Sequence, residues 1–231
     1  MIDYDSFADQ YREMVRKGGP GRAHRFIISR LERITSLSRA SICDLGCGSG
    51  DLSSELARLG ASVTGVDISK KLLAHAQALN EKVDWVHGDA MALPSNFKTA
   101  SYDIVISSLM LMDIPDHKAV FREAYRIVKP GGFMIWLVMH PCFQSPFSHP
   151  DEDGSRKVYQ YAPQFWKSKG TGTLRSTLGA YHRPISQYLN DFMDVGFQSI
   201  RTFEPGSESA APPNAYAPDV PDHFGALGYK N

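Results

Sequence analysis

The sequence predicts an α/β fold built on parallel strands that helices bury. Three observations indicate this class. Short apolar runs alternate with amphipathic stretches along most of the chain, as in doubly wound proteins. The run 102–109 is almost continuously hydrophobic, which is typical of a strand buried on both faces. A loop with three glycines separates the first apolar run from the helix that follows it.

Composition limits the class of protein. The chain has 231 residues, of which 42% are hydrophobic, and this suffices for one large domain or a domain with a small cap. Lys+Arg and Asp+Glu both number 25, and the absence of a basic stripe argues against a nucleic-acid partner. The three cysteines form no CxxC pair, and we see no signal peptide or membrane-spanning run. We therefore expect a cytoplasmic protein with no membrane partner.

Two helices are expected before the first strand. Residues 3–17 carry apolar side chains, among them Tyr4 and Tyr11, on one helical face. The glycines and proline of 18–21 break this helix, and a second helix is expected over roughly 22–38.

The first strand, residues 40–45, runs into Gly46, Gly48 and Gly50. Glycine permits a positive φ and lets a ligand approach the backbone. The next helix, which ends at Gly60, begins at this loop, so its free N–H groups point at whatever binds there. The sequence therefore predicts a ligand site at the end of this strand.

The next two strands also end near acids. Residues 63–67 end in Asp67, which follows the loop by ~20 residues, the spacing that brings a carboxylate to ribose hydroxyls in doubly wound folds. A carboxylate accepts two hydroxyl hydrogens and would repel a 2′-phosphate. Ser69 is expected to cap a helix that runs to Leu79. The strand over 83–90 contains a third acid, Asp89.

The second half of the chain continues the alternation. A helix is expected from Asp116 to Val128, stopped by the Lys-Pro-Gly-Gly of 129–132, with a strand over 133–139. The remaining elements are expected to be a helix from Pro184 to Val195, strands over 197–204 and 223–230, and a surface loop over 205–221.

Residues 140–181 differ from the rest because aromatic side chains lie among Pro, Ser, Gly and charged residues. A stretch of this length between a strand and a helix is usually functional. We interpret it as a cap over a substrate pocket. The alternative is that its aromatic side chains only fix a long excursion to the core.

Several motifs together carry a family resemblance. Residues 44–50 read Asp-Leu-Gly-Cys-Gly-Ser-Gly and fill the first motif of class I S-adenosylmethionine (SAM)-dependent methyltransferases, Asp-x-Gly-x-Gly-x-Gly. For the rival dinucleotide fingerprint, G-x-G-x-x-G, the third glycine comes one residue too early. Residues 4–11 match a Tyr-x-x-x-Ala-x-x-Tyr pattern that, in related methyltransferases, lies near the methionine moiety of SAM. Residues 139–143 and 181–184 resemble segments of the small-molecule branch related to ubiquinone- and menaquinone-biosynthesis methyltransferases, and residues 40–135 carry the strongest resemblance.

The resemblance implies a Rossmann-like, seven-stranded, mostly parallel sheet with helices on both faces, an antiparallel last strand and a small cap. It implies one methyltransferase domain over 1–231, with the helices of 1–39 over the cofactor; residues 140–181 are the stretch interpreted above as a substrate cap. It also assigns ten residues to SAM: Tyr11, Asp44, Gly46, Cys47, Gly48, Asp67, Ile68, Asp89, Ala90 and Ser107. Asp67 would accept from the ribose and Asp89 from the adenine amino group. Tyr11 could equally be a core anchor, and Cys47 a small residue tolerated between glycines.

Two histidines are candidate catalytic residues. His140 follows the fifth strand and His182 precedes the fifth helix, on the rim where ligands of such sheets bind. Either could remove a proton from the methyl acceptor at neutral pH, or bind it. Either could instead be a structural histidine that holds the cap. No histidine pair has metal-ligand spacing, so we expect no metal.

The predicted function is SAM-dependent methyl transfer to an oxygen, or to a nitrogen or carbon, of a small, partly apolar molecule. S-adenosylhomocysteine (SAH) would be the product. Three alternatives stay open: a SAM-binding fold used for a non-methylating reaction such as cyclisation, a non-catalytic SAM-binding module, and a nicotinamide oxidoreductase. The acceptor and the oligomeric state also stay open, with a homodimer among the options.

Overall fold

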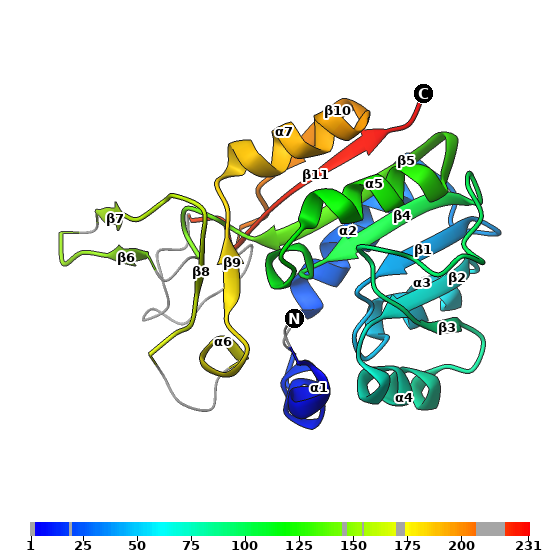
Figure 1. Cartoon of the computed structure of the whole chain (residues 1–231), viewed down its shortest axis with the longest axis horizontal. Helices are drawn as coiled ribbons and strands as arrows, with labels where there is room; N and C mark the ends of the chain where they lie inside the picture. The colour runs from blue at the N-terminus through cyan, green and yellow to red at the C-terminus, as the bar shows by residue number, and fades with distance from the viewer. Residues whose placement is uncertain (1–2, 19, 145–146, 154, 170–173, 207–219) are drawn as a thin grey trace.

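A seven-stranded sheet forms the centre of the computed structural model, and a smaller lobe projects from one end of it (Figure 1). The structure describes residues 3–18, 20–144, 147–153, 155–169, 174–206 and 220–231. The strands of the main sheet are β1 (Ser41–Leu45), β2 (Ser62–Asp67), β3 (Asp84–His87), β4 (Tyr102–Ser108), β5 (Val128–Met139), β10 (Gln198–Phe203) and β11 (His223–Tyr229). The helices of the body are α1 (Ala8–Arg16), α2 (Gly21–Ile34), α3 (Asp51–Arg58), α4 (Lys70–Leu79), α5 (His117–Ile127) and α7 (Ile185–Val195), with 3₁₀ turns η1 (Asp5–Phe7) and η2 (Leu111–Asp113).

The strand order is β10-β11-β5-β4-β1-β2-β3. β11 is antiparallel to both of its neighbours, whereas the pairs among β1 to β5 are parallel. This topology confirms the predicted α/β class, the seven strands and the antiparallel last strand.

Two apolar clusters lie on opposite faces of the sheet. One joins β1, β4 and β5 to α5 and α7, and the other joins the same strands to α2 and α3. Successive residues of β5 alternate between them, so that Trp136 packs among the aromatic rings of Phe121, Tyr188, Phe192 and Phe224, while Ile135 faces α2. This burial of both faces explains why the central strands are hydrophobic almost throughout.

Three predicted boundaries were wrong. The first helix begins only at Ala8, after a 3₁₀ turn, and α2 ends at Ile34 instead of running to 38. β5 begins at Val128, so the Lys-Pro-Gly-Gly segment belongs to a strand. The physical reason lies in the partner strand: Gly131 donates to the Lys230 carbonyl at 2.7 Å, and Lys230 donates to the Gly132 carbonyl at 2.9 Å.

Two further expectations need adjustment. β3 ends at His87, so Asp89 lies in the loop that follows, where its backbone forms an isolated bridge with Ala92. Most of the loop expected over 205–221 lies outside the described residues.

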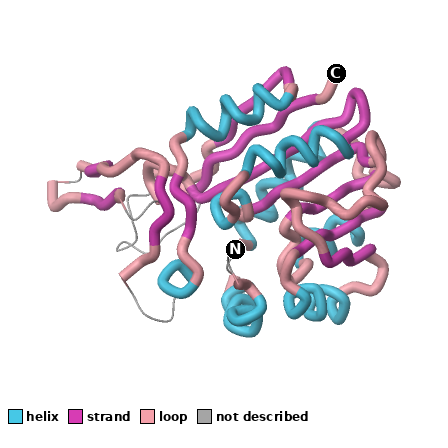
Figure 2. The backbone as a smooth tube through the Cα atoms, in the orientation of Figure 1, coloured by secondary structure: helices cyan, strands magenta, loops and turns pink. Residues whose placement is uncertain are grey.

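The described residues between 140 and 184 form the projecting part, here called the cap lobe. Its elements are β6 (Ser148–Pro150), β7 (Arg156–Val158), β8 (Gln164–Trp166), α6 (Leu174–Thr177) and β9 (Ala180–His182). The strands form two small antiparallel pairs, β6–β7 and β8–β9. Figure 2 shows that much of the rest of the described cap lobe is loop. β9 lies against η2, and α1 lies between the cap lobe and α4 (Figure 1).

Candidate functional site

A cavity of about 480 Å³ opens where the strands of the main sheet end. Asp67 at the end of β2, Ser108 at the end of β4 and Met139 at the end of β5 contribute to its wall. Tyr4 and Tyr11 of the N-terminal segment line one side, and Trp166 and His182 of the cap lobe line another. Its volume is in the range of sites for small organic molecules.

The glycine loop after β1 forms the floor of this cavity. Gly46, Gly48 and Gly50 have φ angles of +74°, +56° and +82°, which residues with a side chain rarely adopt. The N–H groups of Gly46 and Cys47 donate to the Val66 carbonyl at 2.8 and 3.0 Å, so the loop is fixed to the end of β2. A Cβ on Gly50 would come within 2.4 Å of the Trp85 ring, which leaves room only for glycine.

Asp67 joins the glycine loop to α4. One carboxylate oxygen accepts from the Gly48 N–H and the other from the Ser69 N–H, both at 2.8 Å. Asp67 is buried, and this burial raises its pKa against the effect of the two hydrogen bonds. Each oxygen has a further lone pair, so the carboxylate can still accept from a ligand hydroxyl.

The structure brings most of the predicted cofactor residues together. Those that line the cavity are Tyr11, Gly46, Gly48, Asp67, Ile68, Asp89 and Ala90. Asp44, Cys47 and Ser107 do not line it and are buried below the surface. Asp44 accepts from the Ser53 hydroxyl at 2.6 Å, and burial raises its pKa to about 6. Because side chains alternate along a strand, Ser108 lines the cavity where Ser107 was expected.

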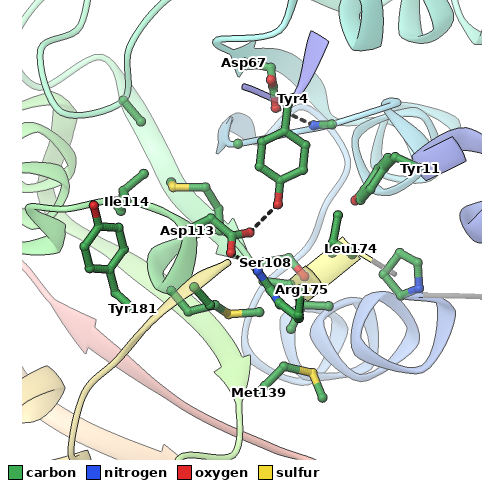
Figure 3. A pocket seen from close by; sticks show the side chains of 18 of the residues that line it. Tyr4, Tyr11, Asp67, Ser108, Asp113, Ile114, Met139, Leu174, Arg175 and Tyr181 are labelled. Carbon is green, nitrogen blue, oxygen red and sulfur yellow. Dashed lines mark hydrogen bonds and ion pairs between the residues drawn. The ribbon is translucent and has the colours of Figure 1, made fainter. Parts of the chain in front are cut away.

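Sequence reasoning missed a group of three side chains in the middle of the cavity (Figure 3). The Tyr4 hydroxyl donates to Asp113 Oδ2 at 2.5 Å, and the Arg175 guanidinium forms an ion pair with Asp113 Oδ1. Arg175 also donates to the Gly179 carbonyl at 3.0 Å. The three residues come from the N-terminal segment, η2 and α6, and no spacing in the sequence relates them.

His140 lines the cavity, but both ring nitrogens have partners. Nδ1 accepts from the N–H groups of Cys142 and Phe143 at 3.1 and 3.3 Å, and Nε2 lies 3.3 Å from Glu204. Because backbone N–H groups only donate, the ring must carry its proton on Nε2 and donate it to the carboxylate. Burial lowers the pKa of His140.

His182 also lines the cavity but has a different hydrogen-bond pattern. It is 5% exposed, and the rings of Phe147 and Tyr161 meet it edge-on at 5.7 and 5.4 Å. Burial lowers the pKa of His182, and the nearby Tyr161 backbone opposes this in part. Nε2 is buried and has no partner among the described residues. His182 therefore differs from His140 in having a ring nitrogen without a partner among the described residues.

Arg183 fixes His182 relative to the opposite wall of the cavity. Its guanidinium donates to the backbone carbonyls of Leu111, Ile114 and Pro115 at 3.0, 2.6 and 2.8 Å. Arg183 is 5% exposed, so these bonds satisfy a buried charge. Its position between a histidine and a proline was visible in the sequence, but its partners lie about 70 residues earlier and were not.

The remaining wall of the cavity is mainly apolar, with Met112, Ile114 and Leu174 among its members. Leu109, directly after β4, has a φ of +60°. Such a conformation is rare for a leucine and is often found at functional sites. The apolar wall favours a ligand with an apolar part.

Other site types have less support. Within the described ranges, no three His, Cys, Asp or Glu side chains form a group that could hold a metal ion. All three cysteines are free thiols. In the part of the chain that the structure describes, no helix has the length and apolar character needed to cross a bilayer.

Comparison with known proteins agrees with the geometry. Residues 43–136 match the family model of the methyltransferase domain. The chain is 35% identical over 120 residues to a demethylmenaquinone methyltransferase of Lactococcus lactis, and the match covers 48% of this chain and 47% of the relative. It is 36% identical over 118 residues to a ubiquinone biosynthesis O-methyltransferase of Ralstonia nicotianae, covering 48% and 49%. The chain thus spans about half the length of the curated relatives it matches.

A solved structure extends the likeness to nearly the whole chain. An S-adenosylmethionine-dependent methyltransferase of Mesorhizobium loti superposes with a TM-score of 0.75 at 25% identity, covering 91% of this chain and 97% of the other. These findings confirm the family resemblance noted in the sequence. The cap lobe lies outside the residues that the family model matches.

Proposed function

We propose that this chain, which contains a methyltransferase domain over residues 43–136, transfers the methyl group of SAM to an oxygen of a small, partly apolar molecule. One observation carries the proposal. A single cavity has a glycine loop and the Asp67 carboxylate on one wall, and a buried histidine with an unused nitrogen on another. Nitrogen and carbon acceptors are compatible with the same site.

The residues present fit SAM. Asp67 has one lone pair left on each oxygen for the ribose hydroxyls, and Gly46 and Gly48 leave the loop backbone open to a ligand. Asp89 and Ala90 line the same cavity and are available to the adenine ring. Asp44 would act on the cofactor only through the loop backbone, since it lies beneath it. When bound, SAM would supply a methyl group attached to a positively charged sulfur. SAH, with a neutral sulfur, is the good leaving group of the transfer.

His182 is the proposed proton acceptor for the methyl acceptor's hydroxyl. Burial lowers its pKa, which favours the neutral ring at pH 7, and Nε2 has no partner among the described residues. Because Nε2 is itself buried, the proposal requires the cap lobe to shift when the acceptor binds. His140 is proposed to be structural because both of its nitrogens have partners.

The acceptor is proposed to be a small molecule with an apolar part, in agreement with the apolar wall of the cavity. The names of the relatives associate them with menaquinone and ubiquinone biosynthesis, which makes related compounds the first acceptors to test. We further propose one domain over 1–231, with residues 1–39 over the cofactor, residues 140–181 as a substrate cap, and a cytoplasmic location.

Two measurements test the proposal. Calorimetry should detect binding of SAM and SAH to the whole chain, and titration with NADH should not. A screen of acceptors with methyl-labelled SAM should then find a labelled product together with SAH. Conversion of an acceptor without SAH release would indicate a non-methylating reaction instead, and no turnover over a broad panel would indicate a binding module.

A further inference from the structure

Asp113 is the meeting point of two separate covers of the cavity. The N-terminal segment reaches it through Tyr4, and the cap lobe reaches it through Arg175 (Figure 3). The side chain of Asp113 is 6% exposed and that of Arg175 is 20% exposed, so the ion pair is largely shielded from water. A buried carboxylate is costly unless its partners remain in place.

The other polar contacts of the N-terminal segment are more accessible. Asp5 accepts from the Ser69 hydroxyl at 2.6 Å in a partly buried contact, and Arg12 forms an ion pair with Asp51 at 3.0 Å, with side chains 23% and 30% exposed. An ion pair that is partly open to water contributes less to stability than a shielded one of good geometry. The Tyr4 contact is therefore the strong polar attachment of this segment inside the cavity.

The two partners of Asp113 strengthen each other. Burial raises the pKa of Asp113, and the positive charge of Arg175 opposes that rise. Arg175 thus favours the ionised carboxylate, to which the Tyr4 hydroxyl donates a charge-assisted bond. If Arg175 moves away, the carboxyl group takes up a proton more readily and the bond to Tyr4 weakens.

We propose that Asp113 is a positioning residue that couples the N-terminal segment to the cap lobe, so that both covers release the cavity together. Tyr4 and Tyr11 line the same cavity as Asp67, and the Tyr11 ring lies next to Gly48 of the glycine loop, so we infer that cofactor exchange involves movement of the N-terminal segment. The coupling makes the cap lobe respond to the same event. This inference rests on the proposed SAM and SAH site.

The first test measures the rate of SAH dissociation by stopped flow with the full chain. Tyr4→Phe keeps the ring and removes the hydroxyl, and should raise the rate about tenfold, the loss expected for one charge-assisted bond. In an Asp113→Asn background the same change should raise it less than about twofold, since the ionised partner is already absent. Equal effects in both backgrounds would overturn the proposal.

Arg12→Met is the matched control. Arg12 attaches the same N-terminal segment to the body through Asp51, which is distant in the sequence from Asp113. Its effect on SAH dissociation should be the same with Asp113 or with Asn at position 113. A control that is as non-additive as Tyr4→Phe would mean that the variants loosen the segment in general, and would also overturn the proposal.

A second test needs no ligand and separates this inference from the proposed function. Hydrogen exchange of the amides in α6 and β9 should be faster in Tyr4→Phe than in the unmodified protein, and unchanged in Arg12→Met. Failure to bind SAH would contradict the proposed function, and this comparison would still decide the coupling. Unchanged exchange in Tyr4→Phe would overturn it.

Discussion

The sheet body and the cap lobe are stabilised in different ways. In the body, the parallel strands pair residue by residue, and two apolar clusters bury both faces of the sheet. In the cap lobe, the strands are three residues long, and single side chains such as Arg183 and Arg175 tie the lobe to the body. The body depends on many similar contacts, and the cap lobe on a few particular ones.

This difference separates cofactor binding from acceptor choice. Apart from Tyr11 of the N-terminal segment, the proposed cofactor residues lie on the body, within the segment that the family model matches. The proposed base and much of the apolar wall belong to the cap lobe or face it. This division predicts a common donor site and an individual acceptor site. The four experiments below test the two sites and the stability of the body that carries them.

The largest effect is expected at His182. His182→Ala should lower kcat by about 10²- to 10⁴-fold, the usual contribution of a general base, with little change in SAH affinity. For the unmodified protein, kcat should rise with pH through a pKa below 6.5 and then level off, because the base must be neutral and burial lowers its pKa. Steady-state rates and calorimetry measure both quantities.

His140→Ala is the matched variant for that experiment. It removes a histidine that lines the same cavity but has both nitrogens engaged. We expect it to lower stability and to leave the pH dependence of kcat in place. If His140→Ala abolished the pH dependence and His182→Ala did not, the two roles would have to be exchanged.

The second prediction concerns the rigidity of the body. Gly50→Ala should lower the free energy of unfolding by about 2–5 kcal/mol, because a left-handed alanine is strained and its Cβ would overlap Trp85 and Ala76. Gly131→Ala has a similar φ of +79° but open space around the Cβ, and should cost about 1–2 kcal/mol. Urea unfolding measures both, and equal losses would mean that the loop yields more easily than its packing implies.

The third prediction concerns the cofactor wall. Asp67→Asn should weaken SAH binding about tenfold, since a charge-assisted acceptor for ligand hydroxyls is lost. Asp44→Asn, beneath the loop, should change SAH affinity less than about threefold because Asp44 does not line the cavity. Calorimetry that ranks the two variants the other way would favour the sequence-based role of Asp44.

The smallest expected effect is that of pH on stability. Burial lowers the pKa of His24, His117 and His223 in the body to about 4. Below pH 6.5 the unfolded chain therefore binds more protons at these positions than the folded chain does. The free energy of unfolding consequently decreases as the pH is lowered. Asp44, with a pKa raised to about 6, acts in the opposite direction, as do Asp67 and Asp113, whose pKa values burial also raises. We expect a net loss of about 1 kcal/mol from pH 7 to pH 6, measured by urea unfolding.

The sequence predicted those parts of the fold that follow from local patterns. The glycine loop, the end of β2 at Asp67 and the cap of α4 by Ser69 could be located because backbone conformation and capping depend on neighbouring residues. The Lys-Pro-Gly-Gly segment shows the limit of this reasoning. The segment was predicted to end a helix and precede a strand. Instead it is part of β5, because its backbone pairs with that of Lys230, about a hundred residues later.

On the side of the cavity that the body forms, most of the site residues were predictable, whereas in the cap lobe only His140 and His182 were. Asp113 and Arg175 are 62 residues apart, and Arg183 binds carbonyls about 70 residues earlier. Contacts of this kind depend on how the cap lobe folds back, which no periodicity in the sequence encodes. For the same reason, the difference between His140 and His182 depended on which neighbours their ring nitrogens meet.

The three tryptophans of the chain are distributed in a useful way. Trp85 touches the glycine loop, Trp136 lies in the aromatic core, and Trp166 lines the cavity from the cap lobe. Each region thus has its own intrinsic fluorophore. Variants that retain a single tryptophan, with phenylalanine at the other two positions, would report optically on the donor wall, the interior or the cover, without an attached dye.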